Sequence, residues 1–418
     1  MRRMLLVTVS VILAMTGRAQ TSAVRPETRI ENSLIDAVAL FEASDIASAS
    51  AIFQRLHAAD STNDAVCYYL GMCQRASGRP ESAQEFLSMA VGLDSANVWY
   101  RNALANLYIE TGKALKAAPL MEKLVRDCPQ SYSTPYTFTL IGDSYSLVRR
   151  DSTVLSWYER ALDLDPDYAP AEMGRAEYMR SCGNLPAFFV SLGKVIRNRD
   201  VTPSAKSSYL KNLLQQMDAR TWWVWGIQYG NLVYDCVAMH PEDLEARWLK
   251  VDVCAIREQW DEALSECRTI LEMSSGSEDK ENYVRACSTC GDILHEQKGD
   301  EKGCFKMYEL ALERDPEYVP VLNNYAYYLC EKGKKLRKAL KMSQVTIEKA
   351  PDNATYLDTY AWILHLLGRD SEAKPYFKHA LIYGGRDSKV VLGHYSEVLD
   401  SLGEKDLAEY YRRLSEKQ

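Results

Sequence analysis

Residues 141–166 read IGDSYSLVRRDSTVLSWYERALDLDP, and this stretch decides the fold. Val154 and Tyr158 are four residues apart, so they lie one helical turn apart on the same face. Gly142 provides a small position in the first half of the stretch, where a second helix can approach closely. Pro166 ends the second half, because proline cannot continue a helix. The stretch therefore predicts two helices that pack against each other as a hairpin.

Glycine recurs along the chain at intervals of about 34 residues, at the position where each hairpin is expected to turn. The spacing is 34 residues from Gly78 to Gly112 and 35 residues from Gly333 to Gly368. A glycine at that phase marks a helix C-terminus, where a left-handed backbone disfavours any residue with a Cβ atom. The members of this column are Gly78, Gly112, Gly183, Gly299, Gly333, Gly368 and Gly403.

Two columns of small residues accompany the glycines, and prolines follow at the repeat ends. The first small column lies seven residues before the glycine column: Gly71, Ala105, Gly142, Ala176, Ala326, Ala361 and Ser396. The second lies in the following helix: Ala83, Ala117, Ala263, Ala339, Ala373 and Ala408. The prolines are Pro129, Pro166, Pro241, Pro316 and Pro351. Small residues in register predict close helix packing in every unit.

The columns resemble the tetratricopeptide repeat, a helix–turn–helix unit of about 34 residues. In the copy at 141–166 only Val154 departs from the usual alanine. The resemblance covers almost the whole chain after the N-terminal segment, and it implies an all-α fold, a right-handed α-solenoid. By the same resemblance, the first helices of the hairpins line a concave surface that binds partners. Each hairpin needs its neighbours to bury its apolar stripe.

We expect a first solenoid over 20–273, with about seven hairpins of which 203–243 is degenerate, and a second over 285–418, with about four. Residues 203–209 are expected to be an insertion. Residues 274–284 are small and polar, which predicts a linker that could act as a hinge. The expected hairpins are 30–63, 64–97, 98–131, 135–168, 169–202, 210–243, 244–277, 285–318, 319–353, 354–387 and 388–418.

The N-terminus has the pattern of a signal peptide. Arg2 and Arg3 precede an apolar run over 4–15, and small residues follow up to an expected cleavage site after Ala19. The run is shorter than the roughly 20 residues that cross a bilayer. We therefore predict export of the chain, with residues 1–19 removed and the periplasm as its location. The alternative is a membrane tether formed by an uncleaved signal sequence.

Composition argues against several kinds of partner and cofactor. The net charge is −7, and removal of the basic signal peptide would make the chain still more acidic. Nucleic-acid binding needs clustered lysine and arginine, so it is not expected. The 11 cysteines are scattered along expected helices, which is typical of small buried residues rather than a disulfide framework. The alternative is a single disulfide that involves Cys67 or Cys73 and another helix. Cys287 and Cys290 lack a second ligand pair, so neither a metal nor a cofactor is predicted.

The register of the repeat selects the candidate partner-binding positions on the concave face. Asparagine can both donate and accept hydrogen bonds with a peptide backbone. Acidic residues at several of these positions favour a neutral or basic partner, and no lysine or arginine accompanies them. The alternative is that they are solvated groove residues without a role. The candidates are Asn102, Asn106, Thr139, Asp143, Met173, Glu177, Asn323, Tyr327, Asp358 and Trp362.

An aromatic segment near the middle of the chain stands apart from the repeat. One helical stripe contains Trp222, Trp225, Tyr229 and Val233, and another contains Trp223, Ile227 and Tyr234. A helix that is apolar on two sides is usually packed between neighbours, and we expect burial here. The alternative is an exposed aromatic patch that forms an interaction surface or a dimer seam.

The sequence contains no catalytic constellation. Phosphate-binding loops, dinucleotide-binding glycine patterns and a nucleophile elbow are absent, and the six histidines show no pair at ligand spacing. We therefore predict a non-catalytic protein-interaction module or scaffold of the cell envelope, with a peptide segment or protein in its groove. The alternatives are a structural homo-oligomer or a subunit of an envelope assembly or secretion complex, and, more remotely, an enzyme or small-ligand protein.

Overall fold

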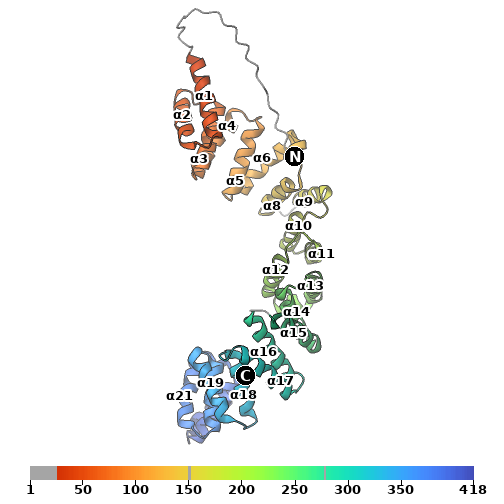
Figure 1. The fold of residues 1–418 in the computed structure, drawn as a ribbon, viewed down its shortest axis with the longest axis vertical. Coiled ribbons are helices and arrows are strands. Elements are labelled where there is room, and N and C mark those ends of the chain that lie inside the picture. The colour runs from red at the N-terminus through yellow and green to blue at the C-terminus, as the bar shows by residue number, and fades with distance from the viewer. Residues whose placement is uncertain (1–25, 149–151, 277–278) are drawn as a thin grey trace, which may run out of the picture. The chain divides into compact units, whose positions relative to one another are not determined.

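The computed structural model describes residues 26–148, 152–276 and 279–418, and within these residues it contains 23 α-helices, one short 3-10 helix and no strand. Two compact units divide the chain, residues 1–194 and 195–418. Within each unit the helices follow one another in chain order as antiparallel hairpins (Figure 1). The predicted all-helical solenoid of repeated hairpins is confirmed.

The first unit contains five hairpins, and the last of these crosses its boundary. A single short helix, α7, is inserted after the third hairpin. The bounds are α1 (Pro26–Glu42), α2 (Ile46–Ala59), α3 (Asp64–Ala76), α4 (Pro80–Leu93), α5 (Val98–Glu110), α6 (Ala114–Asp127), α7 (Pro129–Tyr132), α8 (Pro135–Ser146), α9 (Ser152–Leu164), α10 (Ala169–Ser181) and α11 (Leu185–Arg197).

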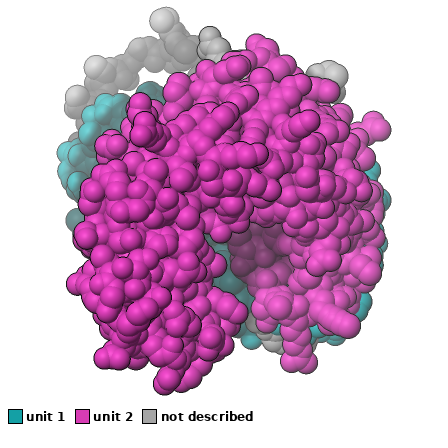
Figure 2. All heavy atoms as spheres, turned by 90° about the horizontal axis from the view of Figure 1, so that it is seen from below, with its two compact units in different colours: residues 1–194 teal, residues 195–418 magenta. Residues whose placement is uncertain are grey.

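The second unit contains six hairpins, with the 3-10 helix η1 before the last. Figure 2 shows that its space-filling surface, in magenta, is hollowed. The bounds are α12 (Pro203–Gln216), α13 (Ala219–Met239), α14 (Leu244–Ile256), α15 (Trp260–Ser275), α16 (Lys280–Glu296), α17 (Glu301–Arg314), α18 (Val319–Glu331), α19 (Leu336–Lys349), α20 (Ala354–Leu366), α21 (Asp370–Ile382), η1 (Gly385–Asp387), α22 (Lys389–Ser401) and α23 (Lys405–Glu416).

The predicted glycine column forms the turns inside the hairpins. All seven of its glycines have a left-handed backbone, with φ between +60° and +80°. At Gly78, which follows α3, this conformation lets the backbone reverse into α4 without steric penalty. Four hairpins lack the glycine. In two of them Ser44 and Glu258 adopt φ values of +64° and +58°, whereas Met217 and Asp218 between α12 and α13 have negative φ. The left-handed turn is therefore kept in two hairpins where the sequence gives no glycine signal.

The small columns form the contact between the two helices of a hairpin. An added Cβ at Gly71 would lie 2.6 Å from Cγ of Leu87, which is closer than real contacts allow. At Gly142 it would lie 2.9 Å from the ring of Tyr158. Every alanine of the second column is buried. Interior packing is dense, so these positions fix the separation of the helices.

Boundaries differ from the sequence expectation at two places. Residues 203–209 are not an insertion but the first turns of α12, where the hydroxyl of Thr202 caps the helix by accepting from the backbone N–H of Ala205. Residues 274–284 lie inside the second unit, and α15 and α16 extend into them from both ends. Residues of both helices, such as Cys267 and Cys287, share one hydrophobic core. A hinge at this position stays a prediction.

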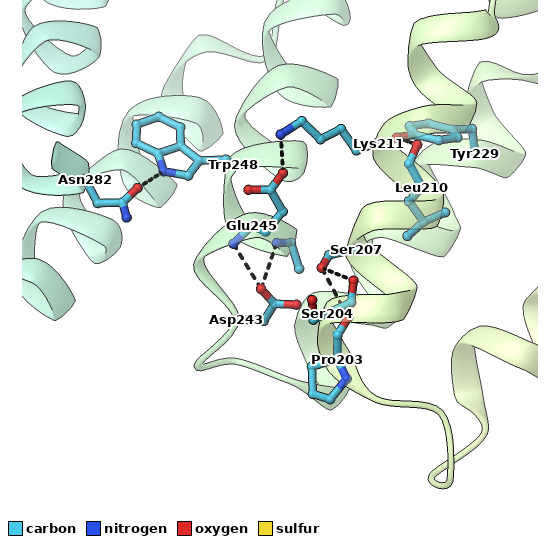
Figure 3. A network of polar contacts seen from close by, with 11 residues as sticks. Pro203, Ser204, Ser207, Leu210, Lys211, Tyr229, Asp243, Glu245, Trp248 and Asn282 are labelled. Carbon is cyan, nitrogen blue, oxygen red and sulfur yellow. Dashed lines mark hydrogen bonds and ion pairs between the residues drawn. The ribbon is translucent and has the colours of Figure 1, made fainter. Parts of the chain in front are cut away.

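Polar contacts join the first helices of successive hairpins in the second unit (Figure 3). Lys211 on α12 forms an ion pair with Glu245 on α14 at 2.5 Å. The indole of Trp248 on α14 donates to Oδ1 of Asn282 on α16 at 2.7 Å. Asp243 caps α14 by accepting from the N–H of Glu245 at 3.0 Å. The face made by the first helices is therefore connected from one hairpin to the next.

All 11 cysteines lie in the described part of the chain and are free thiols. Nine of them are buried, as expected for small apolar residues on packed helices. Cys287 and Cys290 both lie on α16 inside the core. Burial raises the pKa of the Cys287 thiol to about 12, which keeps it protonated and unreactive at neutral pH.

Candidate functional site: two hollows on the first helices

Each unit has a hollow on the face made by its first helices. The hollow of the first unit has a volume of about 460 Å³ and lies over α8, α9 and α10. Three of the predicted groove residues, Asp143, Met173 and Glu177, line it together. Its full lining is Asp143, Ser146, Tyr158, Pro170, Met173, Gly174, Glu177, Tyr178 and Ser181.

A tyrosine–aspartate hydrogen bond forms the floor of the first hollow. The hydroxyl of Tyr158, on α9, donates to Oδ1 of Asp143 at 2.8 Å. Asp143 is exposed as a residue, but its surroundings partly desolvate the carboxyl and raise the pKa of Asp143, and the bond from Tyr158 partly opposes this. An added Cβ at Gly174 would lie 2.8 Å from Oδ1 of Asp143. The absence of a side chain at Gly174 therefore lets α10 approach this pair closely.

The hollow of the second unit has a volume of about 300 Å³ and lies between α18, α20 and the start of α22. Three further predicted groove residues, Asn323, Tyr327 and Asp358, line it. Asn323 and Asp358 are each only 4% exposed. The full lining is Glu296, Asn323, Asn324, Tyr327, Tyr328, Thr355, Asp358, Thr359, Ser388, Val390 and Val391.

A second tyrosine–aspartate pair lies beside this hollow. Asp292 on α16 accepts hydrogen bonds from the hydroxyl of Tyr308 and, at 3.0 Å, from Nδ2 of Asn324. Burial raises the pKa of Asp292, and both donors oppose the shift. Nearby, the hydroxyl of Tyr328 donates to Glu296 at 2.9 Å. The carboxylates are thus held in place by neutral donors.

Asp358 is held by a histidine from the next hairpin. Nδ1 of His394 on α22 lies 3.0 Å from Oδ1 and 3.1 Å from Oδ2 of Asp358 on α20. The His394 ring also stacks on Trp362, with the centroids 4.0 Å apart and an interplanar angle of 12°. Trp362 was selected as a groove residue, and here it fixes the histidine that orients Asp358. The arrangement gives the hollow a positioned carboxylate.

The remaining predicted residues lie outside these two linings. Asn102 and Asn106 are half-buried on α5. Thr139 is buried on α8, where its hydroxyl donates to the carbonyl of Pro135 at 2.8 Å, so its side chain is satisfied within its own helix. The register of the repeat therefore places six of the ten candidates in hollows, and whether any of the ten binds a partner stays a prediction.

Sequence reasoning missed Asp292, Asn324 and His394. One signal was present: Gly291-Asp292 with Tyr308 repeats the pattern of Gly142-Asp143 with Tyr158. In both copies the tyrosine ring packs where a glycine Cβ would be, and its hydroxyl binds the aspartate. The residue 16 positions after Tyr158 is Gly174, and the residue 16 positions after Tyr308 is Asn324. The two copies therefore differ at the position that faces the aspartate carboxylate.

The aromatic segment is buried on one side of α13 only. Tyr229 and Val233, which share a stripe with Trp222, are fully buried, and Trp222 and Trp225 are half-buried. Trp223 and Ile227 are 69% and 70% exposed. The expectation of burial is therefore wrong for Trp223 and Ile227, whereas Tyr234, the third member of their stripe, is half-buried and packs against the core of the second unit. The neighbouring hairpins leave the start of this stripe uncovered.

The described residues contain no group of three or more histidine, cysteine or acidic side chains that could hold a metal ion. Among the helices that the structure describes, none has the length and apolar character needed to cross a membrane. The expected signal peptide, residues 1–19, lies outside the described ranges.

Solved structures with a similar arrangement of helices include three of different sizes. YrrB, a TPR protein with an unusual peptide-binding site, is 16% identical over 43% of this chain and 94% of that chain, with a TM-score of 0.37. Yeast Tom70 is 13% identical over 93% of this chain and 92% of that chain, with a TM-score of 0.37. The structure of Naa15/Naa10 bound to HypK-THB is 14% identical over 92% of this chain and 63% of that chain, with a TM-score of 0.44.

Family comparison gives a firmer result. A tetratricopeptide repeat family matches residues 252–416, and a second tetratricopeptide repeat family matches residues 40–94. No curated protein matches the sequence. The two matched stretches together cover just over half of the 418 residues, and both fall on the hairpins described above. The chain belongs to the tetratricopeptide repeat family.

Proposed function

We propose that this chain is a non-catalytic scaffold that binds a peptide segment or a protein partner on the face made by its first helices. The observation that supports this most is the gathering of six register-selected residues in two hollows. The linings combine carboxylates, amides, hydroxyls and aromatic rings. Such surfaces can satisfy the backbone and side chains of a ligand peptide.

The hollow of the first unit supports the same proposal through its charge. Asp143 and Glu177 line it, Glu177 is paired with Arg180 at 2.8 Å, and no lysine or arginine is among its nine described lining residues, so Asp143 supplies the unbalanced charge. A ligand segment that is neutral or basic is therefore favoured over an acidic one. This distinguishes the chain from an interaction module that captures a carboxylate through basic side chains.

Proximity labelling tests the proposal directly. The full chain, fused to a labelling enzyme at its C-terminus, would be produced in its native cell, and labelled proteins would be identified by mass spectrometry. A matched fusion carrying Asp143→Asn and Asp358→Asn is the control. We expect a small set of proteins to lose labelling in the control. Equal labelling by both fusions would contradict binding on the first-helix face.

Export is proposed on the same footing, because the pattern of residues 1–19 favours it. Cell fractionation of the producing organism, with N-terminal sequencing of the purified chain, tests it. A mature N-terminus near Gln20 in the periplasmic fraction is expected. An intact Met1 in a membrane fraction would indicate the uncleaved tether instead, and an intact chain in the cytoplasmic fraction would contradict export.

The exposed stripe on α13 favours a second candidate function, a structural homo-oligomer or a subunit of an envelope assembly or secretion complex. Trp223, Val224 and Ile227 form an apolar surface on this helix. Light scattering of the purified chain distinguishes this from a monomeric binder. A dimer that dissociates on Trp223→Ala would support the self-associating candidate, and a monomer unaffected by the substitution would count against it.

A further inference from the structure

Asn323 has a buried carbonyl oxygen without a hydrogen-bond donor. The residue is 4% exposed, and its Oδ1 has no partner within the described structure. Its Nδ2 donates to Oδ1 of Asn324 at 3.3 Å, and this bond sets the orientation of the amide. A buried acceptor left unpaired destabilises the folded chain, so a donor from outside the chain would be bound favourably there.

The surroundings of this oxygen are rich in acceptors and carry negative charge. Asp358 and Glu296 line the same hollow, and none of its 11 described lining residues is lysine or arginine. His394 and Tyr328 each supply one donor to these carboxylates. A carboxylate has about four lone-pair sites, so both retain accepting capacity. The lining therefore suits a ligand group that has several N–H donors and positive charge.

The size of the hollow fits one long side chain. Its volume of about 300 Å³ is roughly ten times the liquid volume of a water molecule, about 30 Å³. Tyr327, Val390 and Val391 supply apolar surface for a methylene stem. Burial raises the pKa of Tyr327 to about 12, so it stays neutral and adds a further hydroxyl.

We propose that the hollow between α18, α20 and α22 binds the basic side chain of a lysine or arginine in the partner peptide. The guanidinium or ammonium group would donate to Oδ1 of Asn323 and to the carboxylate of Asp358. This assignment rests on the proposed function, because it needs a peptide on the first-helix face. An acidic ligand group would bring a second negative charge beside Asp358, and an apolar one would leave Asn323 unpaired.

Selection from a random 12-residue peptide library displayed on phage tests the assignment with the full chain. The most enriched sequence would be synthesised with a fluorescent label, and each basic residue would be replaced in turn by norleucine, which keeps the stem but lacks the charge. Dissociation constants would be measured by fluorescence anisotropy. The protein variants are Asn323→Leu and Asp358→Asn, with Asn212→Leu, an exposed residue of α12, as the matched control.

The expected result has three parts. Enriched peptides carry lysine or arginine at a recurring position. Asn323→Leu and Asp358→Asn each weaken binding about 10-fold or more, as for a lost hydrogen bond to a charged group, while Asn212→Leu does not. Norleucine at the recurring position weakens binding to the unmodified chain more than it weakens binding to Asn323→Leu, because Asn323→Leu has already lost one of the two contacts of the basic group.

Other results would overturn the assignment in distinguishable ways. Enriched peptides without a basic residue, or a norleucine effect that is equal in the unmodified chain and in Asn323→Leu, would place basic recognition elsewhere and leave peptide binding intact. Failure to enrich any sequence would contradict the proposed function itself. Asn323→Leu should keep its helical circular dichroism, because its Oδ1 has no internal bond to lose and its Nδ2 gives up only the 3.3 Å bond to Asn324.

Discussion

Tyr308 donates its hydroxyl to the carboxylate of Asp292, and the ring that carries this hydroxyl fills the space left by Gly291. The same relationship joins Tyr158 to Asp143 in the first unit. One local pattern, a glycine–aspartate pair followed by a tyrosine on the next helix, thus fixes both helix separation and the position of a carboxylate. Its two occurrences allow each effect to be measured against an internal control.

Tyr308→Phe is expected to lower the stability of the second unit by about 1.5–3 kcal/mol, the usual value of a hydrogen bond to a charged group. The ring would still fill its space, but Asp292 would keep only Asn324 as donor. Tyr158→Phe is the matched control, and its expected cost is about 1 kcal/mol or less because solvent reaches Asp143. The shift of the urea denaturation midpoint measures the stability loss of each variant. Equal shifts for Tyr308→Phe and Tyr158→Phe would show that Asp292 is no better shielded from solvent than Asp143.

The pH dependence of stability should reveal Asp292. Burial raises its pKa above the value in the unfolded chain, so the folded state binds the proton more tightly. The stabilisation is complete at low pH and is lost as the pH rises from about 4 through the raised pKa. Asp292→Asn should remove this loss, which is visible as a flatter urea midpoint between pH 4 and 7. Parallel pH profiles for the two proteins would show that Asp292 does not titrate in this range.

Gly291→Ala is expected to destabilise the chain by about 1–3 kcal/mol, because its Cβ would collide with the buried ring of Tyr308. Gly92→Ala is the matched control. Gly92 lies within α4 with no atom near its Cβ position, so alanine should stabilise that helix by about 0.5–1 kcal/mol. Thermal unfolding followed by circular dichroism shows whether each substitution lowers or raises the midpoint temperature. A neutral Gly291→Ala would mean that α16 and α17 can separate at little cost.

Lys206 provides a fourth prediction. It is only 1% exposed, and its Nζ lies 2.9 Å from Nε2 of His240. Burial lowers the pKa of Lys206, so the folded state binds its proton less tightly than the unfolded chain does. Stability is therefore expected to rise with pH between the lowered pKa and about 10.4.

Lys206→Met should remove that alkaline rise and should raise stability at pH 7 by about 1 kcal/mol, because an apolar side chain of similar length replaces a buried charge. Urea denaturation at pH 7 and pH 9.5 compares the two proteins, and Lys211→Met, on the same helix but exposed, serves as the control. A variant that loses stability at pH 7 would show that the bond to His240 outweighs the cost of burial.

The sequence allowed the hairpins and much of the groove to be predicted, because both follow from a fixed period. Gly333 and Gly368 mark turns, Ala326 and Ala361 mark helix contacts, and residues at a constant offset from them share a face. Asn323 and Asp358 were selected by this offset, and both lie in the lining of the second unit's hollow. Their position in the repeat was sufficient to select them, without any catalytic or ligand-binding motif.

Other parts of the site depend on neighbours that the period does not specify. His394 binds Asp358 from a position 36 residues away, and nothing in the spacing distinguishes it from a solvated histidine. The start of α12 was misplaced because Pro203 occurs at a helix N-terminus, where proline is tolerated, and not at a repeat end. The exposure of Trp223 depends on which neighbours cover α13, and the sequence pattern alone cannot determine that.

The hollow of the second unit draws on four successive hairpins, since α16 contributes Glu296 and α18, α20 and the start of α22 contribute the rest of its lining. In a repeat protein each hairpin contacts only its neighbours, and the terminal ones fray first. A ligand seated across these hairpins would make their local opening cooperative, because none could leave without releasing it. Amide hydrogen exchange in the last 100 or so residues would then slow together on binding. Binding of a ligand in the hollow would therefore increase the kinetic stability of the C-terminal hairpins.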